Sequence, residues 1–451
     1  MNHVKTGSNK YFQLIPMKIN QNITVIEDLL RPEIKGYSTD NLKEVISIVA
    51  SQTRKGGHAA QLQIAYIKKL VPQGDRYLHE LINLQIIQRS GNAVKGKTSY
   101  QYSFTPEYFS KFITLPLNNQ KLINRILKAH EQKNKAISNS IRGYSEQVKY
   151  LKLMTIDKKF NDFINATYSI ETDKYNSVLA SATRIVNNDI FYSVDSTAGR
   201  FHSNVTNCAK GLRQFLRING EPLVDIDIKN SQPFLSILLL LNPAKVSGMT
   251  KNTTFAMLLQ TLKVPQNKDV SKYISLVVNG QFYEYLMTEF SKEGLQLTRS
   301  ETKVQVLRIL FARNRMPKDE TNRKARQIFI DRFPTVHRVF SKIRGHEKGD
   351  QFTSFKRFAI LLQRIESHLM LQVILKRIYK ELPGTIAVTI HDSIMTGILT
   401  NNVEVVRKIL IDEMALFVGF RPQIKVEGNI KGKEKGKEGE YSLTNMMLQP
   451  L

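Results

Sequence analysis

The chain has 451 residues, with 66 lysines and arginines against 39 aspartates and glutamates, and a formal net charge of +27. This excess favours a polyanionic partner, for which nucleic acid is the default. The single cysteine, Cys208, excludes an intrachain disulfide and argues against a cysteine-based zinc site. No apolar run appears long enough for a membrane span and no signal peptide is visible. We therefore expect a cytoplasmic or nucleoid-associated protein that is not secreted and has no membrane partner.

The N-terminal quarter divides into two parts. Residues 1–36 show no strong period, so we expect a flexible arm. Within residues 37–116, three segments of helical spacing precede two alternating segments: Asp40–Gln52, His58–Leu70, Asp75–Leu84, Ile86–Gln88 and Tyr100–Phe104. Three helices and a ribbon with a basic tip look like a winged helix, whose third helix enters the major groove and whose wing touches phosphate. The contact candidates are Arg76, His79, Lys95 and Lys97; the alternative is a winged helix that only joins proteins.

Two further segments are basic and polar. In residues 117–190, lysines and arginines recur at helical spacings over much of the length, which predicts either a solvated helical linker or a thumb-like segment that grips duplex phosphates. Residues 431–451 begin with KGKEKGKEGE after Ile430, a low-complexity sequence that predicts a flexible basic tail.

The most informative stretch is Leu223–Leu240, LVDIDIKNSQPFLSILLL. Its first half alternates, so Asp225 and Asp227 would share one face of a strand. Its second half is apolar over the length of a helix and begins with residues that favour a helix start. Two carboxylates at the end of a buried strand would repel each other and be costly to desolvate unless a cation shares them. The alternative is an edge strand that carries two solvated acids.

Three other blocks carry polar groups suited to a nucleotide. Thr197–Ser203 places Gly199 before Arg200, whose fork suits a phosphate or a base edge. Arg299, Lys303, Leu307 and Phe311 recur every four residues, so two cations and an aromatic ring would share one helix face. That face could hold a triphosphate and lie against a base and sugar, although an ordinary amphipathic basic helix would show the same spacing.

The last block, Ile386–Gly397, reads as strand, tight turn and strand, with His391 and Asp392 at the turn. An aspartate in this position often serves only the turn backbone. Paired with Asp227, however, Asp392 would complete a two-carboxylate site for two magnesium ions.

In order and spacing, these blocks resemble the palm and fingers of family A (DNA polymerase I-type) polymerases and the related phage-type single-subunit RNA polymerases. The resemblance covers about residues 195–430. Its motifs fall on Thr197–Ser203, on Asp227 with Ser231 and Gln232, on Arg299, Lys303 and Phe311, and on His391, Asp392 and Ser393. Gln363 stands where the family keeps a glutamine before its last motif.

The resemblance implies a role for each matched residue. Asp227 and Asp392 would hold two Mg²⁺ ions, for which Mn²⁺ could substitute, and Asp225 is the alternative ligand. Arg299 and Lys303 would clamp the nucleoside triphosphate, and Lys303 would also protonate the pyrophosphate. The remaining roles are nucleotide binding by Ser231, Gln232 and Phe311, and primer–template binding by Arg200, His391 and Gln363.

The sequence therefore predicts a multi-domain α+β protein: a winged-helix-like domain (37–116), a basic helical segment (117–190), and a right-hand palm and fingers with an antiparallel sheet (191–430). The implied function is primer extension by two-metal catalysis, in replication of a phage, plasmid or mobile element. Departures from the family leave alternatives open, because Ala312 replaces a glycine and the motif-A glutamate is missing. These alternatives are a single-subunit RNA polymerase or primase-like enzyme, and a non-catalytic replication initiator or regulator.

Overall fold

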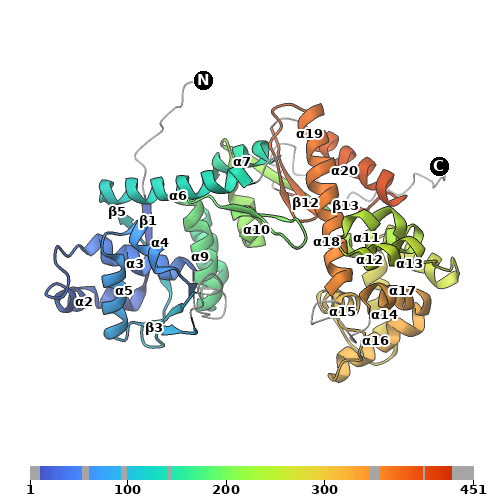
Figure 1. The fold of residues 1–451 in the computed structure, drawn as a ribbon, viewed down its shortest axis with the longest axis horizontal. Helices are drawn as coiled ribbons and strands as arrows, with labels where there is room; N and C mark the ends of the chain where they lie inside the picture. Colours follow the sequence, from blue (N-terminus) through green and yellow to red (C-terminus); the bar gives the residue numbers. More distant parts are fainter. Residues whose placement is uncertain are drawn as a thin grey trace.

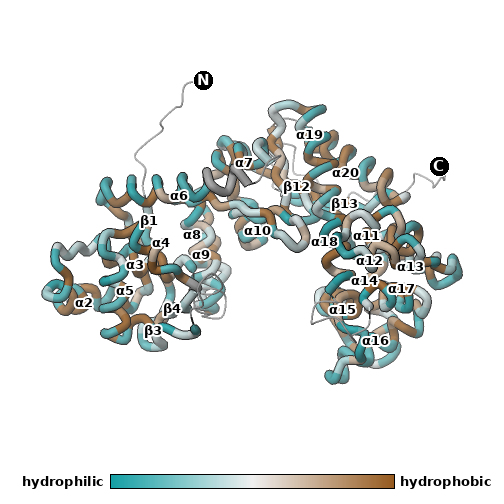
Figure 2. Tube along the Cα trace, viewed as in Figure 1, coloured by the Kyte–Doolittle hydropathy of each residue, from teal (hydrophilic) through white to brown (hydrophobic). Residues whose placement is uncertain are grey.

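The computed structural model describes residues 11–52, 60–92, 99–140, 144–345, 356–399 and 402–428. The chain forms an N-terminal lobe and a C-terminal region, and helix α6 (Gln120–Ser140) extends from the first toward the second (Figure 1). Along most helices hydrophilic and hydrophobic residues alternate, as expected of helices with one buried side (Figure 2).

The N-terminal lobe begins with a strand where an arm was expected. β1 (Tyr11–Pro16) pairs antiparallel with β5 (Phe112–Leu117), and helices α1 (Met17–Gln21) and α2 (Ile23–Leu30) follow it. The expectation of a flexible arm is therefore wrong for residues 11–36. Strand β1 is nearly all buried because α3 (Thr39–Gln52) and α9 (Thr172–Val186) pack against it, which removes the alternation that would have revealed it. Residues 1–10 lie outside the described part.

The three helices expected next are α3, α4 (Ile64–Leu70) and α5 (Gly74–Asn83), and the strands that accompany them pair in the order β2–β4–β3. These strands are β2 (Ala60–Gln61), β3 (Ile87–Ser90) and β4 (Gln101–Phe104). The second helix starts later than expected because Ala60–Gln61 pair with β4 instead. Lys95 and Lys97, which lie between β3 and β4 in the sequence, are outside the described residues.

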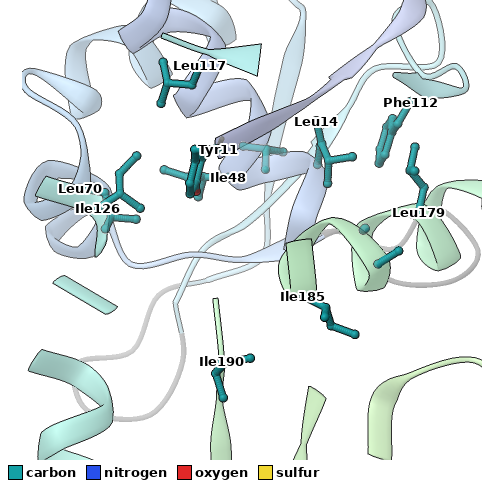
Figure 3. Packing of buried hydrophobic residues seen from close by; sticks show 14 of the residues in the cluster. Tyr11, Leu14, Ile48, Leu70, Phe112, Leu117, Ile126, Leu179, Ile185 and Ile190 are labelled. Atoms are coloured by element: carbon teal, nitrogen blue, oxygen red, sulfur yellow. The ribbon is translucent and has the colours of Figure 1, made fainter. Parts of the chain in front are cut away.

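The segment expected to be a linker, residues 117–190, is distributed over both parts of the molecule. Its elements are α6, α7 (Ser145–Lys152), β6 (Met154–Ile156), α8 (Phe160–Tyr168) and α9. Helix α9 packs against the N-terminal lobe, whereas β6 pairs with a strand of the central sheet. Although this segment is basic, its helices α6 and α9 each have an apolar side. Ile126 on α6 and Ile185 on α9 are buried in one core with Tyr11, Ile48 and Leu70 (Figure 3).

The central sheet is antiparallel and has the strand order β11–β12–β10–β9–β6, with β13 also paired to β10. Its strands are β6, β9 (Leu216–Ile218), β10 (Glu221–Ile228), β11 (Ala387–Ile390), β12 (Ser393–Gly397) and β13 (Ile424–Glu427). A separate hairpin joins β7 (Tyr192–Val194) to β8 (Phe201–Ser203). The sheet separates two hydrophobic cores, because Ile226 and Ile228 join one and Leu223 joins the other. The mixed helix-and-sheet architecture agrees with the expected α+β class.

Helices cover the Ile226 side of the sheet and form the far end of the molecule (Figure 1). The remaining α-helices are α10 (Asn204–Asn207), α11 (Ser231–Leu241), α12 (Thr253–Thr261), α13 (Lys268–Val278), α14 (Phe282–Lys292), α15 (Arg299–Phe311), α16 (Glu320–Arg332), α17 (Pro334–Arg344), α18 (Arg357–Ser367), α19 (Leu375–Glu381) and α20 (Val403–Val418). A π-helical turn, η4 (His368–Ile374), joins α18 to α19.

In the described part of the chain, one continuous helix, Arg357–Glu381, is long and apolar enough to span a membrane by length and composition. This corrects the expectation that no run reaches that length. Of its most apolar window, 61% is buried within the fold, as in the core helix of a folded domain. The helix packs against α11, α17 and α20.

A buried carboxyl group makes the stability of the N-terminal lobe depend on pH. Glu44 on α3 accepts hydrogen bonds from Gln13 Nε2 at 3.0 Å and from the Tyr11 hydroxyl at 3.3 Å. Burial raises the pKa of Glu44 from its ordinary 4.5 to about 8, although these two hydrogen bonds lower it. The folded protein therefore binds this proton more tightly than the unfolded chain.

We predict that the free energy of unfolding falls as the pH rises from about 4.5 to about 8, because Glu44 then loses a proton that the folded state holds. Glu44→Gln should flatten this fall, as measured by urea denaturation at several pH values. Glu131→Gln, on the exposed side of α6, is the control and should keep the wild-type slope. An equal pH dependence in the Glu44→Gln variant would contradict the assignment.

Candidate active site

The two carboxylates singled out in the sequence lie at neighbouring positions in the central sheet. Asp227 is near the end of β10, opposite Ser393 of β12. Ser393 also pairs with Ile390 of β11, so His391 and Asp392 form a two-residue hairpin turn. His391 has φ of +55°, a left-handed conformation that histidine adopts more readily than most residues. The register of three strands therefore brings the turn beside the end of β10.

The electrostatics show that Asp227 and Asp392 interact. Burial, followed by the charges of Asp392 and Asp225, raises the pKa of Asp227 to about 7. Burial likewise raises the pKa of Asp392, whereas hydrogen bonding by its own backbone, the Ser231 hydroxyl and the Lys303 charge lower it. Ser231 Oγ makes no hydrogen bond of standard geometry, although it faces Asp392 closely enough to affect that pKa. Like charges held together in a partly desolvated site favour either a proton or a cation.

The donor set fits a hard divalent cation that is shared with a substrate. Among the described residues, no group of three or more His, Cys, Asp or Glu side chains could hold a metal ion by protein ligands alone. Magnesium is commonly held by one or two carboxylates, with waters and substrate phosphates completing its octahedral shell. Asp227 and Asp392 provide this number of oxygen ligands, and further ligands would come from phosphates and water.

Asp225 shares the strand face of Asp227 but has a different environment. Arg213 Nη1 lies 3.4 Å from one of its carboxylate oxygens, and the other oxygen makes no hydrogen bond of standard geometry, although Ser393 is close enough to affect its pKa. Burial raises the pKa of Asp225, and a hydrogen bond from Ser393 and the Arg213 charge lower it. Asp225 is thus already paired with a protein cation.

Lys303 faces the carboxylate pair from helix α15. The helix begins at Arg299 because Thr298 and Glu301 form a capping box, in which each side chain accepts from the other's backbone N–H. Lys303 is exposed, and its charge lowers the pKa of both Asp227 and Asp392. It is therefore the cation of this helix that acts on both acids.

The other two residues of that helix face are engaged elsewhere. Arg299 Nε lies 2.5 Å from Glu284 Oε1, and its guanidinium lies 5.7 Å from the centre of the Tyr283 ring. Phe311 is half-buried, with its ring centre 6.2 Å from that of Phe358 on α18. Eight residues of helix separate it from Lys303, or about 12 Å. Among the described residues, Phe311 packs on Phe358 and makes no ring contact with the carboxylates.

Arg200 is presented by a turn that Asp195 organises. The Asp195 carboxylate accepts hydrogen bonds from the backbone N–H groups of Thr197, Ala198 and Arg200, at 2.9, 2.6 and 2.9 Å. Gly199 occupies the left-handed conformation that the turn requires, with φ of +72°. The turn directs Arg200 to the interior, where its Nη2 donates to Glu366 at 2.7 Å.

His391 is held neutral beside these cations. Burial, followed by the charges of Arg200 and His202, lowers its pKa to about 4. Its ring centre is 5.9 Å from that of His202, and its Nδ1 has no hydrogen-bond partner. A neutral imidazole with a free nitrogen can take a hydrogen bond from, or give one to, a bound molecule.

Sequence reasoning missed Glu366, a buried acid on α18. One of its oxygens accepts from Arg200, and the other accepts a short hydrogen bond from Gln232 Nε2. Burial, followed by the charge of Asp392, raises the pKa of Glu366 to about 8. A glutamate in the apolar run LLQRIES, three residues after Gln363 and so on the same helix side, was the available signal.

The remaining candidates are less closely tied to the carboxylates. Gln363 is half-buried on α18. Arg76 belongs to α5 in the N-terminal lobe, where its Nη1 lies 3.5 Å from Gln73 Oε1. Arg76 is therefore not part of the C-terminal site.

Comparisons with known proteins add little. No family model and no curated protein matches the chain. Among solved structures, the chain is similar to one described as the "POL domain of Pol1 from M. smegmatis complex with DNA primer-template and dNTP", at 11% identity and a TM-score of 0.29. The match covers 92% of this chain and 66% of that one. So low a TM-score does not establish a shared fold, and the functional proposal therefore rests on the site's own residues.

We predict that Asp227→Asn abolishes binding of divalent cations, because it removes one of two shared carboxylates. Asp225→Asn should weaken binding by about tenfold or less, since Asp225 serves Arg213 and acts from outside the immediate ligands. Titration with Mn²⁺, followed by the electron paramagnetic resonance signal of the free ion, measures both. Equal losses would mean that both aspartates are ligands.

Proposed function

We propose that the protein is a template-directed nucleotidyltransferase that extends a nucleic acid primer with two divalent cations, Mg²⁺ in the cell. The observation that carries this proposal is the meeting of Asp227 and Asp392 from segments far apart in the chain. Both acids have raised pKa values, and Lys303 acts on both. The order of motifs along the sequence supports the same function.

The residues around the pair support distinct tasks in that reaction. Two divalent cations at Asp227 and Asp392 would supply charge stabilisation for the attacking 3′-hydroxyl and the leaving pyrophosphate. Lys303 would bind the triphosphate through charge-assisted hydrogen bonds and donate a proton to the pyrophosphate. Neutral His391 would contact the primer end, and Arg200 would contact the nucleic acid backbone.

The direct test is primer extension by Asp227→Asn and Asp392→Asn. Each should reduce the rate by at least about a thousandfold, because several kcal/mol of charge stabilisation are lost with the cations. Asp28→Asn, an exposed acid on α2, makes the same charge change in the N-terminal lobe and should retain activity. Full activity in either site variant would exclude this mechanism and favour a non-catalytic initiator.

The same assay decides between DNA and RNA products. Phe311 has no phenolic oxygen to bond a 2′-hydroxyl, and the chain lacks the motif-A glutamate that would exclude one. We expect dNTPs to be preferred over NTPs by less than about 100-fold. A preference beyond about 10⁴-fold in either direction would require a sugar-selecting group that is not among these residues.

We also infer that the N-terminal lobe binds duplex backbone as a winged-helix-like module. Support comes from the element order α3–β2–α4–α5–β3–β4 and from a surface hollow of about 440 Å³ at the start of α5. Its lining residues are Lys35, Lys68, Gln73, Asp75 and Arg76. Lys68 is paired with Asp75 at 3.0 Å, which leaves a net positive hollow suited to phosphate.

We predict that Lys35→Ala and Arg76→Ala each weaken duplex binding and reduce its salt slope by about 1, the effect of one lost phosphate contact. Binding is measured by fluorescence anisotropy at several salt concentrations. Lys18→Ala, exposed on α1 away from the hollow, is the control. Unchanged affinity and slope in both variants would indicate a lobe that joins proteins instead.

A further inference from the structure

Apart from Lys303, three cations around the proposed catalytic pair each form an ion pair with a carboxylate outside that pair. These ion pairs are Arg213–Asp225 at 3.4 Å, Lys210–Glu427 at 2.8 Å and Arg200–Glu366 at 2.7 Å. Within the described residues, Asp227 and Asp392 take part in no ion pair. These three positive charges are thus paired with other acids, whereas Lys303 acts on Asp227 and Asp392.

Glu366 is the most deeply buried of these partner acids. Its side chain is 2% exposed, whereas that of Arg200 is 21% exposed. A second hydrogen bond, from Gln232 on the first turn of α11, fixes the other carboxylate oxygen. Because α18 also anchors the Arg200 turn through Arg364 Nε, which donates to Thr197 O at 2.7 Å, the position of Glu366 relative to Arg200 is well determined.

Arg200 lies near the turn that carries Asp392, because the ring centre of His202, two residues after Arg200, is 5.9 Å from that of His391. The Arg200 charge is among the influences that lower the pKa of Asp392. Arginine stays charged at all accessible pH values. If the Glu366 carboxylate were removed, the Arg200 guanidinium would therefore be attracted to another nearby carboxylate. Asp195 already accepts three backbone hydrogen bonds, whereas Asp392 takes part in no ion pair among the described residues. An Arg200–Asp392 pair formed in the absence of Glu366 would occupy oxygens that a cation needs.

We propose that Glu366 is a positioning residue that holds Arg200 away from Asp392 and so reserves the Asp227–Asp392 pair for divalent cations. The inference rests on the proposed function in one respect, namely that this pair binds cations.

The test is Mn²⁺ titration of the full chain, with the free ion followed by electron paramagnetic resonance. Glu366→Gln should weaken binding roughly tenfold, the effect of one misplaced charge at about 4–6 Å. Glu289→Gln is the matched control, because Glu289 is also buried and paired with an arginine, Arg332, on other helices. It should lose thermal stability to a similar extent and bind Mn²⁺ as the wild type does.

Two double variants separate capture by Arg200 from a simple change in net charge. Arg200→Gln/Glu366→Gln removes the competing guanidinium and should restore wild-type affinity. Lys210→Gln/Glu366→Gln restores the same net charge but keeps Arg200, so it should remain weak. Recovery in both, or in neither, would overturn the proposal.

A third variant distinguishes a specific loss of Mn²⁺ binding from misfolding. Glu366→Asp keeps the negative charge and should bind Mn²⁺ more tightly than Glu366→Gln does. If a folded Glu366→Gln protein bound Mn²⁺ with wild-type affinity, this inference would be overturned, but the proposed function would not. If the wild type itself binds no Mn²⁺, or if Asp227→Asn binds it unchanged, the proposed function fails, and this inference fails with it.

Discussion

The arrangement of charged residues in the C-terminal region depends on the repulsion between Asp227 and Asp392 in a partly desolvated site. Burial raises the pKa of both, and the charge of Asp392 further opposes ionisation of Asp227. Such a pair is unfavourable to the folded chain unless a positive charge comes between them. The sheet register and the left-handed turn at His391 nevertheless force them together, so the fold maintains a site that is stabilised by what it binds.

The surroundings of this pair follow from that constraint. A permanent ion pair between one of these acids and a protein cation would relieve the repulsion and also remove the site. Arg213, Lys210 and Arg200 each form an ion pair with another carboxylate. The exposed Lys303 acts on both acids and, among the described residues, forms no ion pair. The distribution of charge thus accounts both for the separate role of Asp225 and for the presence of Glu366 in an apolar helix.

The N-terminal lobe and the central sheet carry different surface features and share one hydrophobic core. The N-terminal lobe is held by a core to which β1, α3, α4, α6 and α9 contribute (Figure 3). It also presents a basic hollow at its surface. The central sheet holds the acids, and the same hydrophobic core extends from the lobe to the Leu223 side of that sheet. The proposed duplex-binding lobe and the proposed catalytic sheet are therefore connected through one hydrophobic core. Helix α6 and strand β6 belong to the segment of chain that joins the lobe to the sheet.

Local rules in the sequence determined the features that depend on neighbouring residues. The alternation in β10, the hairpin turn at His391–Asp392 and the capping box at Thr298 all follow from short-range sterics and hydrogen bonding. Tertiary structure alone decided that β1 is a strand, because burial on both sides erases its alternation. It also decided that Asp225 serves Arg213, that Phe311 packs on Phe358, and that Glu366 receives Arg200 and Gln232. These are contacts between segments distant in sequence, and no period in the sequence encodes which distant side chain a buried charge will meet.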